Sequence, residues 1–504
     1  MRHVLSIIPL LLLPPAMCGC LPEERIVWSP DAAGALVRGP DTLYLADADG
    51  KIQPILDARI AHVAWQDGAR FLAVRVIEVG TWKDLCGYLS GPRRKRIELT
   101  AELLLAQLQA QKDKADPFEP MVQGDLLSAL LYIRDTAWDR VPKSLREQAE
   151  KEGELLLKRP VHAFETYRLV DGKAERTAAI ATTPDAMHAV RLSPDGKVLA
   201  YVSAKADAGE PETLVLNAMP VRAGAQPLPV AEGVAPSVAW SPRGDSVACC
   251  LGRTPEGSET ALWTVCQARV RDAEGALLAK PDVSRQALAL GRSVEVAYLP
   301  DGRVAFVSEQ AGIPAPTTRR PRVNLFTLQV AQEKPQPVCA TEQASALAPP
   351  QAMRLSPDGS RAALFGRDGS VQVVTLATGG VRDVLEPAKA KSATIPMWRN
   401  GGQLCVVLTD KSVVVVALPA DPSQPAVRRV LSKAWPAPLV EFLVTGKRPE
   451  EPPLRSRPAG CRGLRPEAAT TIRPDAGAPP PNDGARLPLR RIGHGVPGTA
   501  EGRY

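Results

Sequence analysis

The side chains that could perform acid–base or metal chemistry are few in this chain of 504 residues. Outside the first twenty residues and the C-terminal region, the histidines are His62, His162 and His188, and no H-E-x-x-H metalloprotease motif occurs. His62 and His188 occupy similar positions in a repeated unit, which favours a structural role. The histidines therefore indicate neither a catalytic site nor a metal site.

Nucleophile and calcium-loop motifs are incomplete. The segments nearest to a Gly-x-Ser-x-Gly elbow, 244–248 (GDSVA) and 291–295 (GRSVE), lack the final glycine. The segment 47–50 (DADG) resembles the opening of a calcium loop, but Ala58 stands where a glutamate ligand is needed, so a hairpin turn is favoured. No phosphate-binding loop occurs either. We expect no catalytic residue, no metal ligand and no cofactor, and hence a protein that is not an enzyme.

The spacing of the cysteines favours a role in core packing over disulfide bonding. With Cys18 and Cys20 set aside, the remaining seven are irregularly spaced and contain no C-x-x-C pair. Cys249, Cys250 and Cys405 lie in apolar runs and are interpreted as small core residues. The pairing state of Cys86 stays open.

The elements that position these residues are copies of one unit, clearest in residues 187–203 (MHAVRLSPDGKVLAYVS). Two apolar runs flank a Ser-Pro-Asp-Gly turn, where proline presets φ, aspartate bonds its own backbone and glycine accepts positive φ. Seven copies align on a bulky residue before the turn, namely Trp28, Trp65, Leu192, Trp240, Tyr298, Leu355 and Trp398. The turn residues, interpreted as structural, are Pro30, Asp31, Asp67, Gly68, Pro194, Asp195, Gly196, Pro242, Gly244, Pro300, Asp301, Gly302, Pro357, Asp358 and Gly359.

The spacing of the copies predicts the fold class. All intervals but one are close to the period of roughly 40–50 residues that is typical of propeller blades. Within one period, residues 352–355, 361–365, 370–376 and 381–385 form four strand-like runs. We predict an all-β propeller of seven four-stranded blades, with six or eight as alternatives. Trp65, Trp240 and Trp398 would be wedges between blades rather than ligand-stacking residues.

These repeats resemble the WD40-like (PD40) repeat of TolB-type propellers, which also occurs in the propeller domains of prolyl oligopeptidase and tricorn relatives. The resemblance rests on the Ser-Pro-Asp-Gly turn after a bulky residue, followed by a strand such as 198–203 (VLAYVS). It covers roughly residues 24–433 apart from one insertion. It implies a propeller fold without selecting one member of the group.

Three further segments complete the predicted organisation around a propeller at 20–433. Residues 80–160 are predicted to be a helical insertion in blade two, with helices near 98–111, 124–134 and 144–157. Its apolar residues either pack on the blade edge or offer a groove to a partner. Residues 447–504, rich in Pro, Gly and Arg, are expected to be disordered.

Residues 1–19 are predicted to be a signal peptide, because a short basic start precedes an apolar run too short to span a bilayer. The run ends in 17–20 (MCGC), which resembles the bacterial lipobox, and Cys20 matches the lipidated position. The alternative is an ordinary secretory signal that leaves a soluble exported protein.

Composition and motifs together suggest a function class. The net charge is +7, but no basic helix with interleaved aromatics occurs, so nucleic-acid binding is not expected. We expect an exported, lipid-anchored scaffold of the bacterial cell envelope that is monomeric and binds a protein or an envelope polymer. The alternative is a secreted propeller enzyme, a lyase, lactonase or hydrolase, whose site is assembled from blade loops at the central funnel.

Overall fold

A computed structural model describes residues 24–448, apart from gaps at 80–81, 90, 111–125, 158–159, 205–212, 254–260, 292–294, 311–321, 331–336, 341–349, 367, 386–389 and 422–423. The predicted signal peptide, the lipidation site Cys20 and residues 449–504 of the predicted tail lie outside the described residues. Ser293 of the second elbow-like segment and Cys461 also lie outside them.

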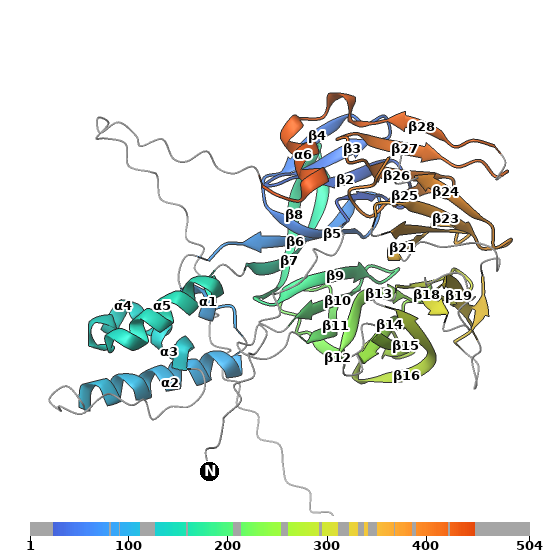
Figure 1. Ribbon diagram of the computed structural model, residues 1–504. Helices are drawn as coiled ribbons and strands as arrows, with labels where there is room; N and C mark the ends of the chain where they lie inside the picture. Colours follow the sequence, from blue (N-terminus) through green and yellow to red (C-terminus); the bar gives the residue numbers. More distant parts are fainter. Residues whose placement is uncertain are drawn as a thin grey trace, which may run out of the picture. The chain divides into compact units, whose positions relative to one another are not determined.

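The described strands form seven antiparallel four-stranded sheets arranged as a ring of blades (Figure 1). Blade one consists of β1 (Ile26–Trp28), β2 (Gly34–Arg38), β3 (Leu43–Asp47) and β4 (Ile52–Leu56). Blade two consists of β5 (Ile60–Trp65), β6 (Arg70–Ile77), β7 (Val161–Val170) and β8 (Lys173–Thr183). Blade three consists of β9 (Ala186–Leu192), β10 (Val198–Ala204), β11 (Leu214–Pro220) and β12 (Leu228–Glu232). Blades four and five are β13 (Val234–Trp240), β14 (Ser246–Arg253), β15 (Ala261–Arg271), β16 (Leu277–Gly291); β17 (Val296–Tyr298), β18 (Val304–Gln310), β19 (Arg322–Leu328), β20 (Val338–Cys339). Blades six and seven are β21 (Pro350–Leu355), β22 (Arg361–Gly366), β23 (Val371–Thr375), β24 (Val381–Leu385); β25 (Met397–Asn400), β26 (Gln403–Val407), β27 (Val413–Ala417), β28 (Val427–Val430).

This architecture confirms the predicted seven-bladed propeller. Among the described residues, seven clusters of buried apolar side chains each fill the interface between two consecutive blades, including blades seven and one. A single sheet could not cover both of its own faces, so each blade is stabilised by its neighbours.

The predicted turn lies between the first two strands of a blade and is stabilised by its serine and aspartate. In blade three, the Ser193 hydroxyl donates to Asp195 Oδ1 at 2.6 Å and accepts from the Val198 amide at 3.0 Å. Ser356 makes the same pair of bonds in blade six, to Asp358 and from the Arg361 amide. Two runs of apolar residues are thereby closed into a hairpin in a fixed register.

The helical insertion interrupts blade two between β6 and β7. It contains α1 (Trp82–Cys86), α2 (Gly91–Ala110), α3 (Leu126–Tyr132), α4 (Arg134–Ala137), the 3-10 turn Trp138–Arg140 and α5 (Lys143–Leu157). Buried side chains of these helices form one cluster with Val161 and with the partly buried Ile77, at the strand ends from which the insertion leaves. The third helix, predicted near 144–157, is α5, which begins one residue earlier at Lys143.

A short helix follows the last blade. α6 (Ala437–Thr445) begins after Pro436 and ends at Gly446, whose φ of 69° is the left-handed conformation that terminates helices. Leu439, Val440 and Leu443 of this helix join buried residues of blades one and seven in one cluster. Among the described residues, no helix is long and apolar enough to cross a membrane.

Candidate functional site

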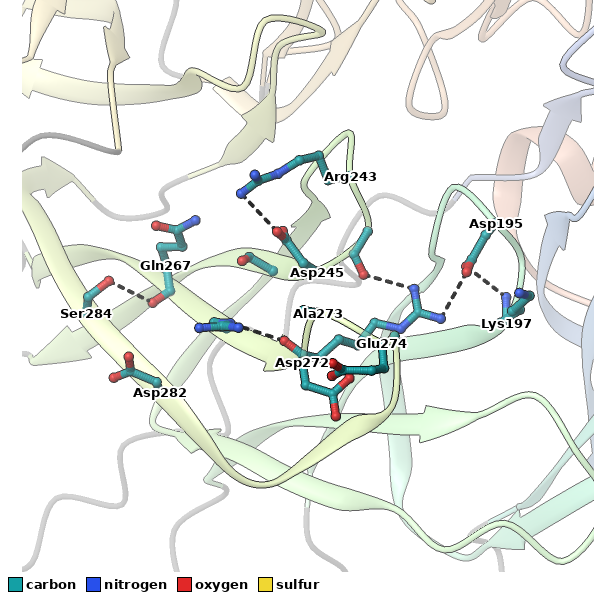
Figure 2. A pocket seen from close by; sticks show the side chains of 15 residues that line it. Asp195, Lys197, Arg243, Asp245, Gln267, Asp272, Ala273, Glu274, Asp282 and Ser284 are labelled. Atoms are coloured by element: carbon teal, nitrogen blue, oxygen red, sulfur yellow. Dashed lines mark hydrogen bonds and ion pairs between the residues drawn. The ribbon is translucent and has the colours of Figure 1, made fainter.

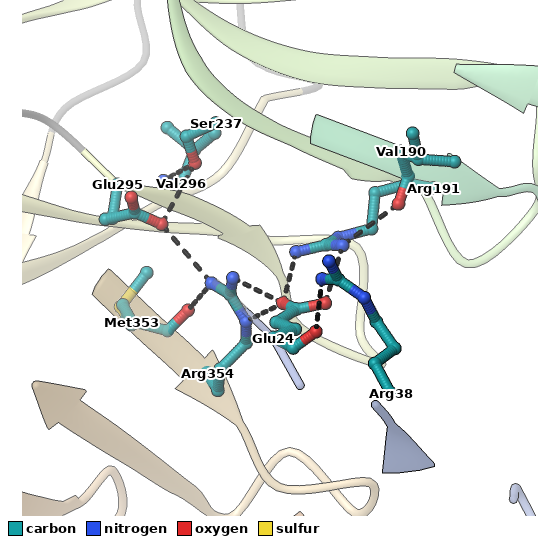
Figure 3. Close-up of polar contacts among 9 residues, drawn as sticks. All are labelled: Glu24, Arg38, Val190, Arg191, Ser237, Glu295, Val296, Met353 and Arg354. Atoms are coloured by element: carbon teal, nitrogen blue, oxygen red, sulfur yellow. Dashed lines mark hydrogen bonds and ion pairs between the residues drawn. The ribbon is translucent and has the colours of Figure 1, made fainter. Parts of the chain in front are cut away.

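The first strands of successive blades contact one another around the propeller axis. A cluster of charged side chains gathers among them (Figure 3). Glu24 lies just before β1. Arg191 of β9 binds its carboxylate with two nitrogens, at 3.0 and 2.6 Å. Arg354 of β21 binds the same carboxylate from blade six. Arg38, at the end of β2, donates to the Glu24 backbone oxygen at 3.2 Å. Residues from three blades therefore hold Glu24 at the axis.

A second carboxylate extends the cluster to blades four and five. Arg354 Nη1 lies 3.4 Å from Glu295 Oε2, so this guanidinium bridges the two glutamates. The hydroxyl of Ser237, on β13, donates to Glu295 at 3.2 Å and accepts from the Val296 amide at 3.1 Å. We call Glu24, Arg38, Arg191, Ser237, Glu295 and Arg354 the axial charge cluster.

The pKa values of Glu24 and Glu295 are shifted in opposite directions. Burial alone would raise the pKa of Glu24, but the two arginines outweigh it and lower the pKa to about 2. Burial raises the pKa of Glu295, and the weaker attraction of Arg354 and Arg191 does not cancel this effect. A pair of carboxylates with separated pKa values is one arrangement that acid–base catalysis uses.

The space beside the cluster is small. A cavity of about 210 Å³ is bordered by Arg191, Ser237, Glu295 and Arg354, whereas small-molecule sites usually enclose about 300–1,000 Å³. His62, near the axis on β5, is held neutral because burial and then Arg38 lower its pKa to about 3. The described residues contain no group of three or more His, Cys, Asp or Glu that could hold a metal ion. The axial cluster is therefore better suited to fixing the chain than to enclosing a ligand.

A larger hollow lies at the turn edge of blades three and four (Figure 2). It encloses about 720 Å³, and we call it the rim groove. Arg271 joins its two sides, because it donates to Asp195 at 3.0 Å and to the Gly244 carbonyl at 3.0 Å. The ionisable residues in its wall are Asp195, Lys197, Arg243, Asp245, Arg269, Arg271, Asp272, Glu274 and Asp282. None of the described residues that line it is aromatic, so it suits a hydrophilic ligand held by hydrogen bonds and charge.

Residues singled out from the sequence lie in hairpin turns, in the propeller core and in the insertion. Asp195 and Gly244, predicted to be structural turn residues, lie in hairpin turns and also line the rim groove. Asp47 accepts the amides of Asp49 and Lys51 at 2.9 Å each, so the calcium-like segment forms a hairpin turn. Cys249, Cys250 and Cys405 are buried in the core. Cys86 is a free, buried thiol among the insertion helices.

Sequence reasoning missed the axial charge cluster, although one signal pointed to it. Arg191 and Arg354 occupy the same position of the repeat, directly before the bulky residue, in largely apolar strands. A charge at a fixed position of a first strand indicates a shared axial location. Glu24 and Glu295 carried no such signal, because each precedes its strand.

Comparison with known proteins supports the fold more than the function. A family described as "Lipoprotein LpqB beta-propeller domain" matches residues 216–440, which is less than half of the chain. The TolB-type resemblance is not confirmed by this match. No curated protein matches the chain.

Solved structures with a similar fold include a hydrolase, a lyase and a yeast protein named Hsv2. A puromycin hydrolase is 12% identical with a TM-score of 0.42, covering 81% of this chain and 51% of that chain. An oligogalacturonate lyase in complex with manganese is 10% identical, covering 78% and 88%, with a TM-score of 0.44. Hsv2 from Kluyveromyces lactis is 9% identical, covering 81% and 98%, with a TM-score of 0.39. The chain spans about half the length of the hydrolase, and likenesses this remote carry no functional argument.

Proposed function

We propose that this protein is an exported, lipid-anchored scaffold of the bacterial cell envelope that binds a hydrophilic protein segment or envelope polymer. The observation that carries the proposal is the position of Glu24. This residue follows the lipobox-like Cys20 by four positions and is fixed at the axis by Arg191 and Arg354. The anchor would therefore leave the propeller beside its axis, where a propeller enzyme would assemble its site.

The rim groove is the proposed binding surface. It lies at the edge of the turns between first and second strands, whereas Glu24 lies at the opposite edge, where first strands begin. An anchored propeller would thus turn the groove away from the membrane. The similarity of residues 216–440 to a lipoprotein propeller domain supports the proposed export and lipid anchoring.

Anchoring is tested by palmitate labelling in cells. Wild-type protein should incorporate label and Cys20→Ala should not, because lipidation requires the cysteine thiol. Equal labelling of the two proteins would overturn the anchor assignment.

Groove binding is tested by recovery of partners from solubilised envelope and from isolated cell-wall material. Lys197→Glu/Arg269→Glu reverses two exposed charges of the groove wall and should abolish recovery of the specific partner. Lys51→Glu/Lys173→Glu reverses two exposed charges on blades one and two and should leave recovery unchanged. Equal recovery with both variants would remove the groove from the proposal.

An enzyme with an axial site is the second candidate, and Glu295 is the observation that favours it. Its raised pKa and its place beside a cavity suit a general acid. The small cavity and the ion pairs that Glu24 and Arg354 make weigh against it. A lactonase, lyase or esterase activity of the wild type that Glu295→Gln abolishes would replace the binding proposal.

A further inference from the structure

Helix α2 of the insertion carries apolar residues on two opposite faces. Ile97, Ala101, Leu104 and Leu108 point into the core of the insertion. Leu99 and Leu103, four residues apart and hence on one stripe of the other face, are 50% and 63% exposed. Large exposed apolar side chains that are adjacent on one helix indicate a surface that another apolar phase covers.

Basic residues border this stripe. Lys95 and Arg96 are exposed one turn before Leu99, and at 100° per residue they flank the same face. Arg94, also exposed, pairs with Glu98 at 2.9 Å. Glu102, next to Leu103, is also exposed, so the basic charge lies at the N-terminal end of the stripe. Leucine beside lysine and arginine is one feature of helices that lie in the headgroup region of an anionic bilayer.

The insertion leaves the propeller at the edge where Glu24 enters it. Arg38 donates both to the Glu24 backbone oxygen and to the Ile60 carbonyl at the start of β5, at 3.2 and 3.0 Å. The Val76 amide, on β6, donates to the Arg59 carbonyl at 2.8 Å. One short series of bonds thus connects Glu24 to the strand end from which the insertion departs.

The anchor limits the distance between this edge and the membrane. Cys20 and Glu24 are four positions apart, and an extended chain spans at most about 14 Å over that distance. A lipid on Cys20 therefore keeps the Glu24 edge, including the root of the insertion, close to the bilayer surface.

We propose that α2 is a second membrane contact, with Leu99 and Leu103 toward the acyl chains and Lys95 and Arg96 at anionic headgroups. The proposal deepens the proposed function, because it uses the anchor to bring the helix to the membrane. The lipid affinity of the helix itself does not depend on acylation, so the two can be tested separately.

The test uses the unacylated mature chain, residues 20–504 with Cys20→Ser, in sedimentation with phosphatidylcholine vesicles containing about 30% phosphatidylglycerol. This chain should bind these vesicles and should not bind pure phosphatidylcholine. Leu99→Gln/Leu103→Gln, which keeps helix propensity, should weaken binding about tenfold or more, because two leucines no longer leave water. Lys95→Gln/Arg96→Gln should weaken it about tenfold and reduce its dependence on salt.

The matched control is Leu288→Gln/Val338→Gln, which changes two residues of blades four and five that are 66% and 63% exposed. This variant should bind as the parent does. The proposal is overturned if the parent does not bind anionic vesicles, or if the α2 leucine variant binds as well as the control. Failure of palmitate labelling would instead refute the anchor and leave the vesicle result standing.

Discussion

The axial charge cluster shows how a buried charge is kept in this fold. The Glu24 side chain is 15% exposed and lies between Arg191 and Arg354. Removing a carboxylate from water is costly, and the cost is offset here by two guanidinium partners. Removing Glu24 would leave the two arginines with Glu295 as their remaining carboxylate neighbour in the cluster.

We predict that Glu24→Gln destabilises the protein at neutral pH. The lowering of the pKa from 4.5 to about 2 corresponds to about 3 kcal/mol of folding free energy. Urea unfolding at pH 7 should show a loss of this order. Glu78→Gln is the control, because its pairs with Arg59 and Arg448 are surface-exposed and its loss should stay below about 1 kcal/mol.

The same pair of proteins has a defined pH dependence. A carboxyl whose pKa is lowered by folding stabilises above its unfolded pKa and loses this contribution as pH falls toward the folded pKa. The difference between wild type and Glu24→Gln should therefore be full above about pH 4.5 and fall to less than half near pH 3. A difference that stays constant over this range would contradict the ion-pair account.

At the residue scale, the sequence revealed turn chemistry better than the site. Ser193, Asp195 and Gly196 are adjacent in the chain, so their mutual bonds could be predicted from one short segment. Glu24 and Arg354 are 330 residues apart, and only the closed ring brings them together. Long-range ion pairs of this kind carry no local pattern.

At the element scale, the repeated turn and tryptophan connect blades as well as shaping each one. Trp65, Trp240 and Trp398 each donate from the indole nitrogen to a first-strand carbonyl of the preceding blade, at 2.9, 3.0 and 2.8 Å. Each predicted wedge tryptophan thus also donates a hydrogen bond to the neighbouring blade. Any Cβ added at Gly359 would overlap the Pro300 ring in the turn of the preceding blade.

We predict that two turn glycines respond differently to alanine. Gly359 and Gly302 both have positive φ, at 68° and 87°, so each substitution should cost about 1–2 kcal/mol of backbone strain. No atom lies within 4 Å of a Cβ at Gly302, whereas Gly359 meets Pro300. Thermal or urea unfolding should show a loss of at least about 3 kcal/mol for Gly359→Ala. Equal losses for both variants would show that the turns do not pack on one another.

The strands were more predictable than the helices for a physical reason. Each blade copies the same alternation of apolar run and turn, so the clear copies in blades three and six located the faint ones in blades one, two and seven. The insertion occurs once, so no second copy located its boundaries, and the helix predicted near 98–111 begins seven residues earlier, at Gly91. α2 has apolar residues on both faces. Its exposed leucines became visible only when the buried face was known.

At the scale of the whole molecule, the ring is closed by packing rather than by a shared strand. Every blade is made of four strands that are consecutive in the chain, including blades one and seven. α6 and Trp435, which directly precedes the helix cap Pro436, cover the junction between blades one and seven. The Trp435 indole donates there to the Gly50 carbonyl at 2.7 Å. Arg25, next to Glu24, donates to the carbonyls of Phe442 and Leu443 at the end of α6. Both ends of the described chain therefore meet at this junction.

We predict that removal of α6 opens the ring. A chain ending at Ala434 loses Trp435, Leu439, Val440 and Leu443, which are buried in one cluster with blades one and seven, and also the buried Phe442. Burial of a large apolar side chain contributes about 1.5–3 kcal/mol, so the loss should be at least about 5 kcal/mol and remove the cooperative unfolding transition. A chain ending at Arg448 keeps this cluster and should unfold at the same urea concentration as the full chain. Matching transitions for both truncations would mean that blades one and seven hold the ring closed without α6.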